Sequence, residues 1–338
     1  MTRQVAVQAC GMTTAIGLTA PSACAALRAR LANFQETRFI SRDGAWILGA
    51  EVPLETPWRG LQRLVHLLAG PLRECLDACP DLAPEAIPLF LCVAEPERAG
   101  RLDGLDDRLA AGLTEALGCS FHRSSRIVAY GQVGGAVALD QTRKLIAAGT
   151  VTCAIVAGVD SFLLAETIRA YDAEDRLLSE ANSNGFIPGE AGAAILLGPA
   201  GTGGLRLLGI GLAAEKARLG SDLPLRADGL VAAMRISLDE AGLDFAQVSY
   251  RISDLCGEQY YFKEAALAAG RLLRGPHDVP DLWHPADGFG YTGAAAIPLM
   301  LGVSLTAARK GYAPGPIVLG QASHDDGRRA TMVLRMEA

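Results

Sequence analysis

Histidines are few in this sequence and nucleotide-binding loops are missing. Its 338 residues contain five histidines, and none stands in the HxxxH or HxH spacing that places two imidazoles on one metal ion. No GxxxxGK[ST] segment and no GxGxxG following a strand occurs, which argues against nucleotide binding. We therefore expect no metal and no cofactor.

Long apolar runs and basic clusters are missing as well. No stretch reaches the roughly 18 uninterrupted apolar residues of a membrane span, and the N-terminal segment MTRQVAVQACGM lacks the layout of a signal peptide. The net charge is -6 and the basic residues are scattered, which disfavours nucleic acid and anionic membranes as partners. We expect a cytoplasmic protein whose partners are proteins or small molecules.

Apolar residues, in contrast, are plentiful and periodic. They make up 50% of the chain, enough to fill the core of one large domain or of two closely packed ones. Strand-like runs alternate with helical periodicity, and a similar order occurs twice, which indicates an internal duplication with a boundary near 199–204. The predicted domains are 1–200 and 201–338. The predicted strands include 4–10, turning at Gly11, and the predicted helices include one starting at Ser22 as N-cap and one over 60–78.

The stretch 126–149, RIVAYGQVGGAVALDQTRKLIAAG, organises the prediction. An apolar strand, a tight turn and a buried helix follow one another. Such a turn holds its apical residue, Gln132, at a helix N-terminus, where backbone N-H groups favour negative charge. A glutamine amide is no nucleophile near neutral pH. The alternative is that Gly131, Gly134 and Gly135 only let a strand and a helix pack closely.

Three segments together resemble the β-ketoacyl-acyl carrier protein synthase branch of the thiolase-fold family. VAVQACGMTTAIGLTAPSACAALRAR resembles the opening strand, turn and helix of the family. The region 153–197 is similar to its GGVDS, GR-L and GFxxGEGA elements, and DGFGYTGAAAIPLML over 287–301 resembles its GHxxGAAG loop. The resemblance implies an α/β thiolase-like fold: two duplicated βαβαβαββ halves in a layered α-β-α-β-α sandwich.

The same resemblance implies which positions would carry chemistry. The family uses an elbow cysteine and two histidines. The matched motifs place Gln132 at the cysteine and Gly290 at the second histidine. The first histidine falls at Cys256-Gly257 or, if the match is shifted, at Asp254. The lysine before the second histidine falls near Pro285, and the segment 320–329 replaces the FGFGG loop. Further predicted substrate-site residues are Tyr130, Gly131, His284, Phe289 and His324.

A glutamine on the elbow also occurs in relatives of such synthases. Chain-length factors, which pair with an active synthase, have it, and so do loading ketosynthases that decarboxylate without condensing. The second comparison fits less well, because losing even one oxyanion donor typically costs about a hundredfold or more in rate, and both histidines are missing. For Gln132 two roles stay open: its amide plugs a disused pocket and bonds backbone groups, or it shapes a tunnel.

Three functional hypotheses follow. The first is a non-condensing pseudoenzyme, dimeric through the strand before the elbow, that acts as a partner subunit or a binding scaffold. It would form a homodimer or pair with an active ketosynthase, and an acyl carrier protein is a further possible partner. The second is an active synthase or acyltransferase with relocated residues, with Cys256 as nucleophile near Asp254, Glu258, His284 and His324. The third is a protein-interaction module of an unrelated assembly.

Overall fold

Two halves of the chain share one sheet in the computed structural model, which describes residues 4–201, 203–275 and 278–337. Within these residues a ten-stranded sheet has the order β10-β9-β11-β12-β8-β1-β7-β6-β4-β5. The halves join where β1 pairs with β8 over Ala6 and Val7. The sheet is mixed, with antiparallel pairs at its centre and parallel pairs toward both edges.

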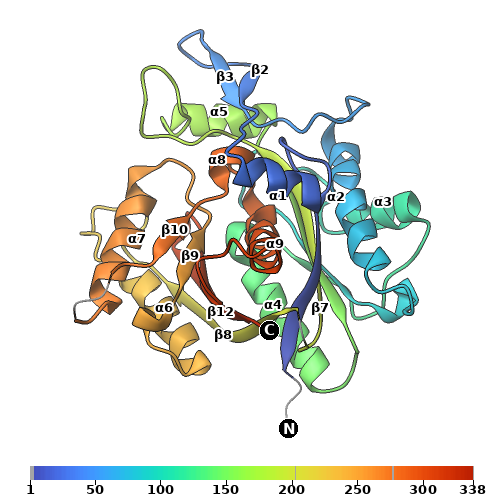
Figure 1. Cartoon of the computed structure of the whole chain (residues 1–338). Coiled ribbons are helices and arrows are strands. Elements are labelled where there is room, and N and C mark those ends of the chain that lie inside the picture. The colour runs from blue at the N-terminus through green and yellow to red at the C-terminus, as the bar shows by residue number, and fades with distance from the viewer. Residues whose placement is uncertain (1–3, 202, 276–277, 338) are drawn as a thin grey trace.

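The first half carries the predicted elbow. Its strands run in the spatial order first, fifth, fourth, second, third, counted along the chain. A separate hairpin projects from the body (Figure 1). The elements are β1 (Val5–Thr13), α1 (Ala20–Arg28), the hairpin strands β2 (Gln35–Ile40) and β3 (Trp46–Gly49), α2 (Gly60–Asp77), η1 (Pro84–Ala86), β4 (Leu89–Cys92), α3 (Arg108–Leu117), β5 (Arg126–Val128), η2 (Gly131–Val133), α4 (Gly134–Ala147), β6 (Ala154–Ser161), α5 (Ala165–Ala173) and β7 (Glu190–Pro199).

The second half repeats this spatial order. From β8 outward its strands again run first, fifth, fourth, second, third. The repeat agrees with the predicted duplication, while the division of the chain into domains at residue 200 stays a prediction. The elements are β8 (Leu205–Ala214), α6 (Asp228–Ala241), η3 (Phe245–Gln247), β9 (Tyr250–Ser253), α7 (Gln259–Leu272), β10 (Asp281–Trp283), α8 (Ala286–Phe289), η4 (Gly293–Ala295), α9 (Ala296–Arg309), β11 (Ile317–Ser323) and β12 (Arg328–Met336).

The layers follow from where apolar faces are buried. Helices α4 and α9 lie at the centre, between the two halves of the curved sheet, with α2 and α3 outside one half and α6 and α7 outside the other (Figure 1). Helix α9 is buried on almost every side, as expected of a helix between two sheet layers. The predicted layered α/β thiolase-like arrangement is confirmed.

The two central helices begin in the same way. Each follows a 3-10 turn that opens with a glycine of positive φ, +53° at Gly131 and +51° at Gly293. The residue before each glycine also has a similar backbone conformation, with φ -126° at Tyr130 and -113° at Thr292. The elbow therefore occurs twice, once per half, and the two copies lie against each other.

Two local predictions were wrong. Strand β1 does not turn at Gly11 but continues to Thr13. A Cβ at Gly11 would lie 2.2 Å from the carbonyl oxygen of Pro71, so this glycine allows β1 and α2 to approach closely. The N-cap of α1 is Thr19, while Ser22 is the third helical residue and completes a capping box with it.

Some elements lacked a clear periodic signal. No periodic pattern in the sequence predicted β2, α5, β10 or α8, which have between three and nine residues. The helices of the described ranges include none with both the length and the apolar character of a membrane span.

Candidate active site

The elbow buries Gln132 at the end of strand β5. The chain leaves β5, passes through the exposed Tyr130 and turns at η2 into α4. At the apex Gln132 is 2% exposed. Gly135, the second residue of α4, is needed because a Cβ there would lie 2.6 Å from the Cβ of Ile297 on α9. Strand, turn and helix thus place the Gln132 amide in the interior, next to the second elbow.

The Gln132 amide is engaged by Tyr291. Its Nε2 donates a short hydrogen bond to the Tyr291 hydroxyl, and both side chains are buried. The other amide atom, Oε1, has no hydrogen-bond partner among the described residues. One of the two predicted roles had the Gln132 amide bonding backbone groups. The amide instead bonds a side chain from the second half of the chain.

Tyr291 belongs to an aromatic cluster formed with Phe162, Tyr171 and Phe186. The Tyr291 ring centroid lies 4.7 Å from both phenylalanine centroids, and Tyr171 packs on Phe186 at 5.1 Å. All four side chains are buried, and burial raises the pKa of Tyr291 well above its ordinary value. The phenol therefore stays protonated and the cluster fills the interior beside the elbow.

Little empty space remains next to Tyr291. A cavity of only about 20 Å³ is lined by Asp254, Phe289, Gly290 and Tyr291, together with residues of α9. Such a volume holds about one water molecule. This cavity has no room for an acyl chain. No acyl tunnel therefore begins beside Gly290, the predicted position of the second histidine.

Gly290 and Phe289 have structural reasons for their identity. Gly290 ends α8 with φ +69°, and a Cβ there would lie 2.8 Å from the Cβ of Ala50. Phe289 is 1% exposed and forms part of the central core. A histidine at position 290 would be strained by the positive φ, and its Cβ would clash with the Cβ of Ala50.

Cys256 lies close to the cluster but is poorly suited to be a nucleophile. Its thiol packs partly buried against the aromatic cluster. Burial, with added repulsion from Glu258 and Asp254, raises the pKa of Cys256 well above its ordinary value. Because the thiolate is the reactive form, this environment opposes the relocated-nucleophile hypothesis.

Two buried carboxylates lie against the two elbow glycines. A Cβ at Gly131 would lie 2.5 Å from Oε2 of Glu95, and one at Gly293 would clash in the same way with Oδ2 of Asp160. That Asp160 oxygen also accepts the backbone N-H of Ala294 at 3.0 Å. Carboxylate oxygens thus lie where a nucleophilic elbow would favour developing negative charge.

Arg98 joins these carboxylates. Its guanidinium bonds both oxygens of Glu95, at 2.6 and 2.8 Å, and Oδ2 of Asp160 at 3.3 Å. Its Cζ also lies 4.1 Å above the Phe162 ring of the aromatic cluster. Burial opposes ionisation of Glu95, but hydrogen bonding from His324 and the charge of Arg98 outweigh it and hold the pKa of Glu95 well below its usual range.

His324 was predicted as a site residue, and it does reach the elbow. It is 5% exposed, with Nε2 3.5 Å from Oε2 of Glu95 and Nδ1 2.8 Å from Oδ1 of Asp326. Burial lowers the pKa of His324, but the two carboxylates outweigh burial and raise it. Both ring nitrogens are engaged, so this imidazole is a bridge between carboxylates.

The other charges of the segment 320–329 are also paired internally. Arg176 binds Glu258 at 2.8 Å and Asp325 at 2.7 Å. Arg329, which is 1% exposed, binds Glu264 at 2.9 Å. These pairs fix the segment that stands where the family has its gating loop, and they leave little of its charge for an external ligand.

An open cleft lies in front of the elbow. Its volume is about 1550 Å³, and its lining includes Tyr130, Ile127, His324 and Arg328. The Arg328 guanidinium lies 4.8 Å above the Tyr130 ring. Ile127 belongs to β5, the last strand of the sheet, so the cleft and the sheet edge form one continuous surface.

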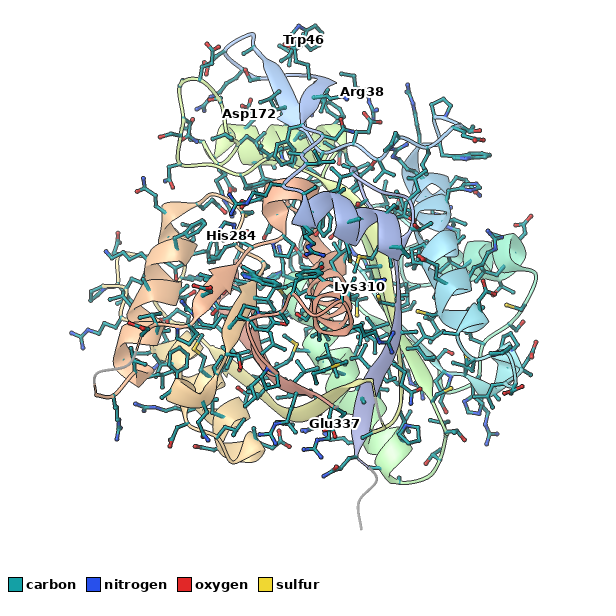
Figure 2. The ribbon with its side chains drawn as sticks, in the orientation of Figure 1. Arg38, Trp46, Asp172, His284, Lys310 and Glu337 are labelled. Carbon is teal, nitrogen blue, oxygen red and sulfur yellow. The ribbon has the colours of Figure 1, made fainter. Side chains whose placement is uncertain are left out.

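His284 is not brought to this site. It follows β10, as its label in Figure 2 shows. Its Nδ1 lies 2.9 Å from Oδ1 of Asp287, and its ring packs on Phe262. Hydrogen bonding to Asp287 raises the pKa of His284. The structure therefore groups Gln132, Cys256 and Gly290 around Tyr291, places Gly131, Tyr130 and His324 at the cleft, and leaves His284 elsewhere. In the described part of the chain no group of three or more His, Cys, Asp or Glu side chains is arranged to hold a metal ion.

Comparison with known proteins places the fold. No protein-family model and no curated protein sequence matches the chain. Among solved structures, "The ishigamide ketosynthase/chain length factor" matches with a TM-score of 0.80 at 17% identity, over 100% of both chains. The chain has the ketosynthase fold. The structure of the ketosynthase ApeO in complex with its chain length factor ApeC, from Xenorhabdus doucetiae, matches at TM-score 0.76 and 17% identity, over 99% of this chain and 98% of that chain.

A third similar structure contains a carrier protein. It is a type II polyketide synthase acyl-carrier protein in complex with its ketosynthase bound to the hexaketide, AntDE:AntF, and it matches at TM-score 0.82 and 14% identity over 99% of this chain and 100% of that chain. Four residues around the elbow were not predicted as site residues from the sequence: Glu95, Arg98, Asp160 and Tyr291. A signal existed for two of them, because Glu95 lies three residues after the buried strand β4 and Asp160 is the last residue but one of the buried strand β6.

Proposed function

We propose that this chain is a non-condensing, ketosynthase-like subunit that pairs with a condensing ketosynthase. The observation that carries the proposal is the bond between Gln132 and Tyr291. It places an amide where a ketosynthase would present its nucleophile, and a phenol beside the position of the second histidine. Neither group forms an acyl-enzyme near neutral pH, and both are buried.

The filled interior favours a partner or scaffold role over one that binds an acyl chain. The aromatic cluster and the 20 Å³ cavity beside it support a subunit that holds no acyl chain of its own behind Gln132. Similar structures that contain a ketosynthase with a chain length factor, or with an acyl-carrier protein, support pairing within such an assembly. In this proposal, the carrier protein delivers its acyl group to the partner.

The sheet edge supports a position for the partner. Strand β5 pairs with β4 on one side and ends the ten-stranded sheet on the other. An unpaired edge strand offers backbone N-H and C=O groups to a second chain. We propose that the partner ketosynthase adds its own strand along Arg126–Val128 and covers the adjoining cleft.

Co-purification tests this proposal. The chain is co-expressed with the condensing ketosynthase of the same organism, one chain is affinity-tagged, and the mass of the eluted complex is measured by light scattering. A heterodimer is expected from wild type. Ile127→Asp, on β5, should abolish it by placing a charge in the interface.

The matched control is Ile236→Asp. Ile236 is exposed on α6, so this variant should keep the heterodimer. Elution of the wild-type chain without the ketosynthase contradicts the proposed partner. Equal loss in both variants contradicts the proposed position at β5.

A further inference from the structure

A second cavity adjoins the cleft in front of the elbow, between the loop that follows β8 and the first turns of α7. Its volume is about 390 Å³. The loop contributes Arg218 and Ser221, α7 contributes Gln259 and Lys263, and Asn184 closes one end. Asn184, Arg218 and Ser221 also line the cleft in front of the elbow, so the two hollows are continuous.

The cavity is positively charged although the chain is acidic overall. Arg218 and Lys263 both line it, both are exposed, and neither forms an ion pair with any described residue. Its lining contains no Asp or Glu side chain. Of the neighbouring acids, Glu258 binds Arg176 and Glu264 binds Arg329, while Asp222, next to Ser221 in the loop, forms no ion pair with a described residue and does not line the cavity. Two unneutralised cations on one concavity favour an anionic ligand.

Hydrogen bonds hold the walls of the cavity in place. The Ser221 N-H donates to the Arg218 carbonyl at 2.9 Å, which closes a turn in the loop. The Tyr260 hydroxyl donates to the Ala217 carbonyl at 2.5 Å and ties the loop to α7. The Gln259 N-H donates to Oδ1 of Asn184 at 2.7 Å, which leaves the Asn184 Nδ2 donors for a ligand. The loop backbone and the Asn184 amide are therefore held in place before any ligand arrives.

One wall is apolar. Leu223 and Leu225 line the cavity, and Leu223 is 55% exposed. A bare inorganic anion would leave these side chains in water. A ligand with an aliphatic segment next to its charged group would cover them, at a gain of about 0.8 kcal/mol for each CH₂ group removed from water.

We propose that this cavity binds a small phosphate ester with an aliphatic body. The guanidinium of Arg218 and the ammonium of Lys263 would bind the phosphate oxygens, with hydroxyl and amide donors from Ser221 and Asn184. Phosphate suits two converging cations and neutral donors because its oxygens accept several charge-assisted hydrogen bonds. The aliphatic body would lie on Leu223. Arg218 and Ser221 also line the cleft that the proposed partner would cover, but the binding test below uses the chain alone, so its outcome is separate from that of the co-purification test.

Calorimetric titration of the full chain with hexyl phosphate tests the proposal, with inorganic phosphate and hexanol as partial ligands. Hexyl phosphate should bind more tightly than either. Arg218→Gln and Lys263→Gln should each raise its Kd about tenfold, the loss expected for one charge-assisted hydrogen bond. Leu223→Asn should weaken hexyl phosphate but leave inorganic phosphate unchanged.

Two matched controls accompany these variants. Arg235→Gln removes an exposed arginine of α6, and Leu31→Asn removes an exposed leucine after α1. Both should bind hexyl phosphate like wild type. The proposal is overturned if wild type does not bind hexyl phosphate at millimolar concentration, or if Arg235→Gln weakens binding as much as Arg218→Gln does.

Discussion

The side chain of Gln132 donates a hydrogen bond to the hydroxyl of Tyr291, a residue 159 positions further along the chain. Gln132 stands in the elbow of the first half and Tyr291 directly before the elbow of the second. The bond therefore joins the two pseudo-equivalent turns of a duplicated fold. In the ketosynthase arrangement these turns carry a nucleophile and a histidine, and here they carry a mutually satisfied amide and phenol.

Tyr291→Phe should lower the free energy of unfolding by about 1–3 kcal/mol, because it leaves the buried Nε2 of Gln132 without its acceptor. Urea unfolding measures the change. Tyr171→Phe is the matched control, since the Tyr171 hydroxyl makes no hydrogen bond within the described ranges, and it should cost less. If the two variants are equally stable, the bond contributes nothing specific.

The double variant Gln132→Leu with Tyr291→Phe should recover part of this loss. Both polar partners are then removed together, and replacing both members of a buried pair is milder than removing one. A double-mutant cycle measures the coupling. Strict additivity of the two single changes would contradict a direct interaction.

Gly131→Ala should destabilise the fold for two reasons. The positive φ costs about 1–2 kcal/mol for a residue with a Cβ, and the new Cβ would lie 2.5 Å from the Glu95 carboxylate. Gly118→Ala separates these effects, since Gly118 also has positive φ (+70°) but its Cβ would face open space. Thermal unfolding should show the larger loss for Gly131→Ala, and equal losses would mean that Glu95 moves away at no cost.

Glu95→Gln should lower the free energy of unfolding by about 3 kcal/mol, because it breaks a buried ion pair. This value is the lower end of the usual range, since Arg98 keeps Asp160 as a second partner. The same change should bring down the pKa of His324, which the Glu95 carboxylate holds up. Chemical denaturation and an NMR titration of the histidine measure the two effects.

Asp106→Asn is the control for Glu95→Gln. Asp106 pairs with Arg101 at 2.7 Å at the surface, where an exposed ion pair contributes at most about 1 kcal/mol. A comparable loss in both variants, or an unchanged His324 titration, would mean that Glu95 does not organise the elbow.

Asp254 should make stability depend on pH. Burial raises the pKa of Asp254 to about 7, above the value of about 3.9 in an unfolded chain. Between these two values the folded state keeps the proton that the unfolded state releases, so the contribution of this carboxyl to stability is full below about pH 4 and is lost as the pH rises to about 7. Relative to Asp254→Asn, wild type should lose free energy of unfolding on the order of a few kcal/mol from pH 4 to pH 8. A constant difference across this range would contradict the raised pKa.

The sequence was sufficient for the elements that are long or buried. The strand, turn and helix around Gln132 could be predicted because an apolar run, three glycines and a helical segment stand next to one another. The duplicated order followed from the same alternation. Short elements such as β10 and α8 were missed, since three or four residues carry no measurable period.

The interior of the site could not be predicted. Tyr291 was visible only as one residue of the GYTG segment, and nothing local indicates that its hydroxyl meets a side chain 159 positions away. The pairing of Arg98 with Glu95 and Asp160 likewise depends on parallel strands that end at the same edge. These contacts are set by tertiary structure, so a pattern within one segment does not contain them.

Intact-mass spectrometry, with carbon dioxide release measured in parallel, tests the central claim most directly. Purified chain is incubated with acyl and malonyl carrier-protein thioesters, and a condensing ketosynthase serves as positive control. We predict no mass increase of the chain and no carbon dioxide release above that of the Gln132→Ala variant. A covalent acyl adduct on the wild-type chain, or decarboxylation that Gln132→Ala abolishes, would contradict the account.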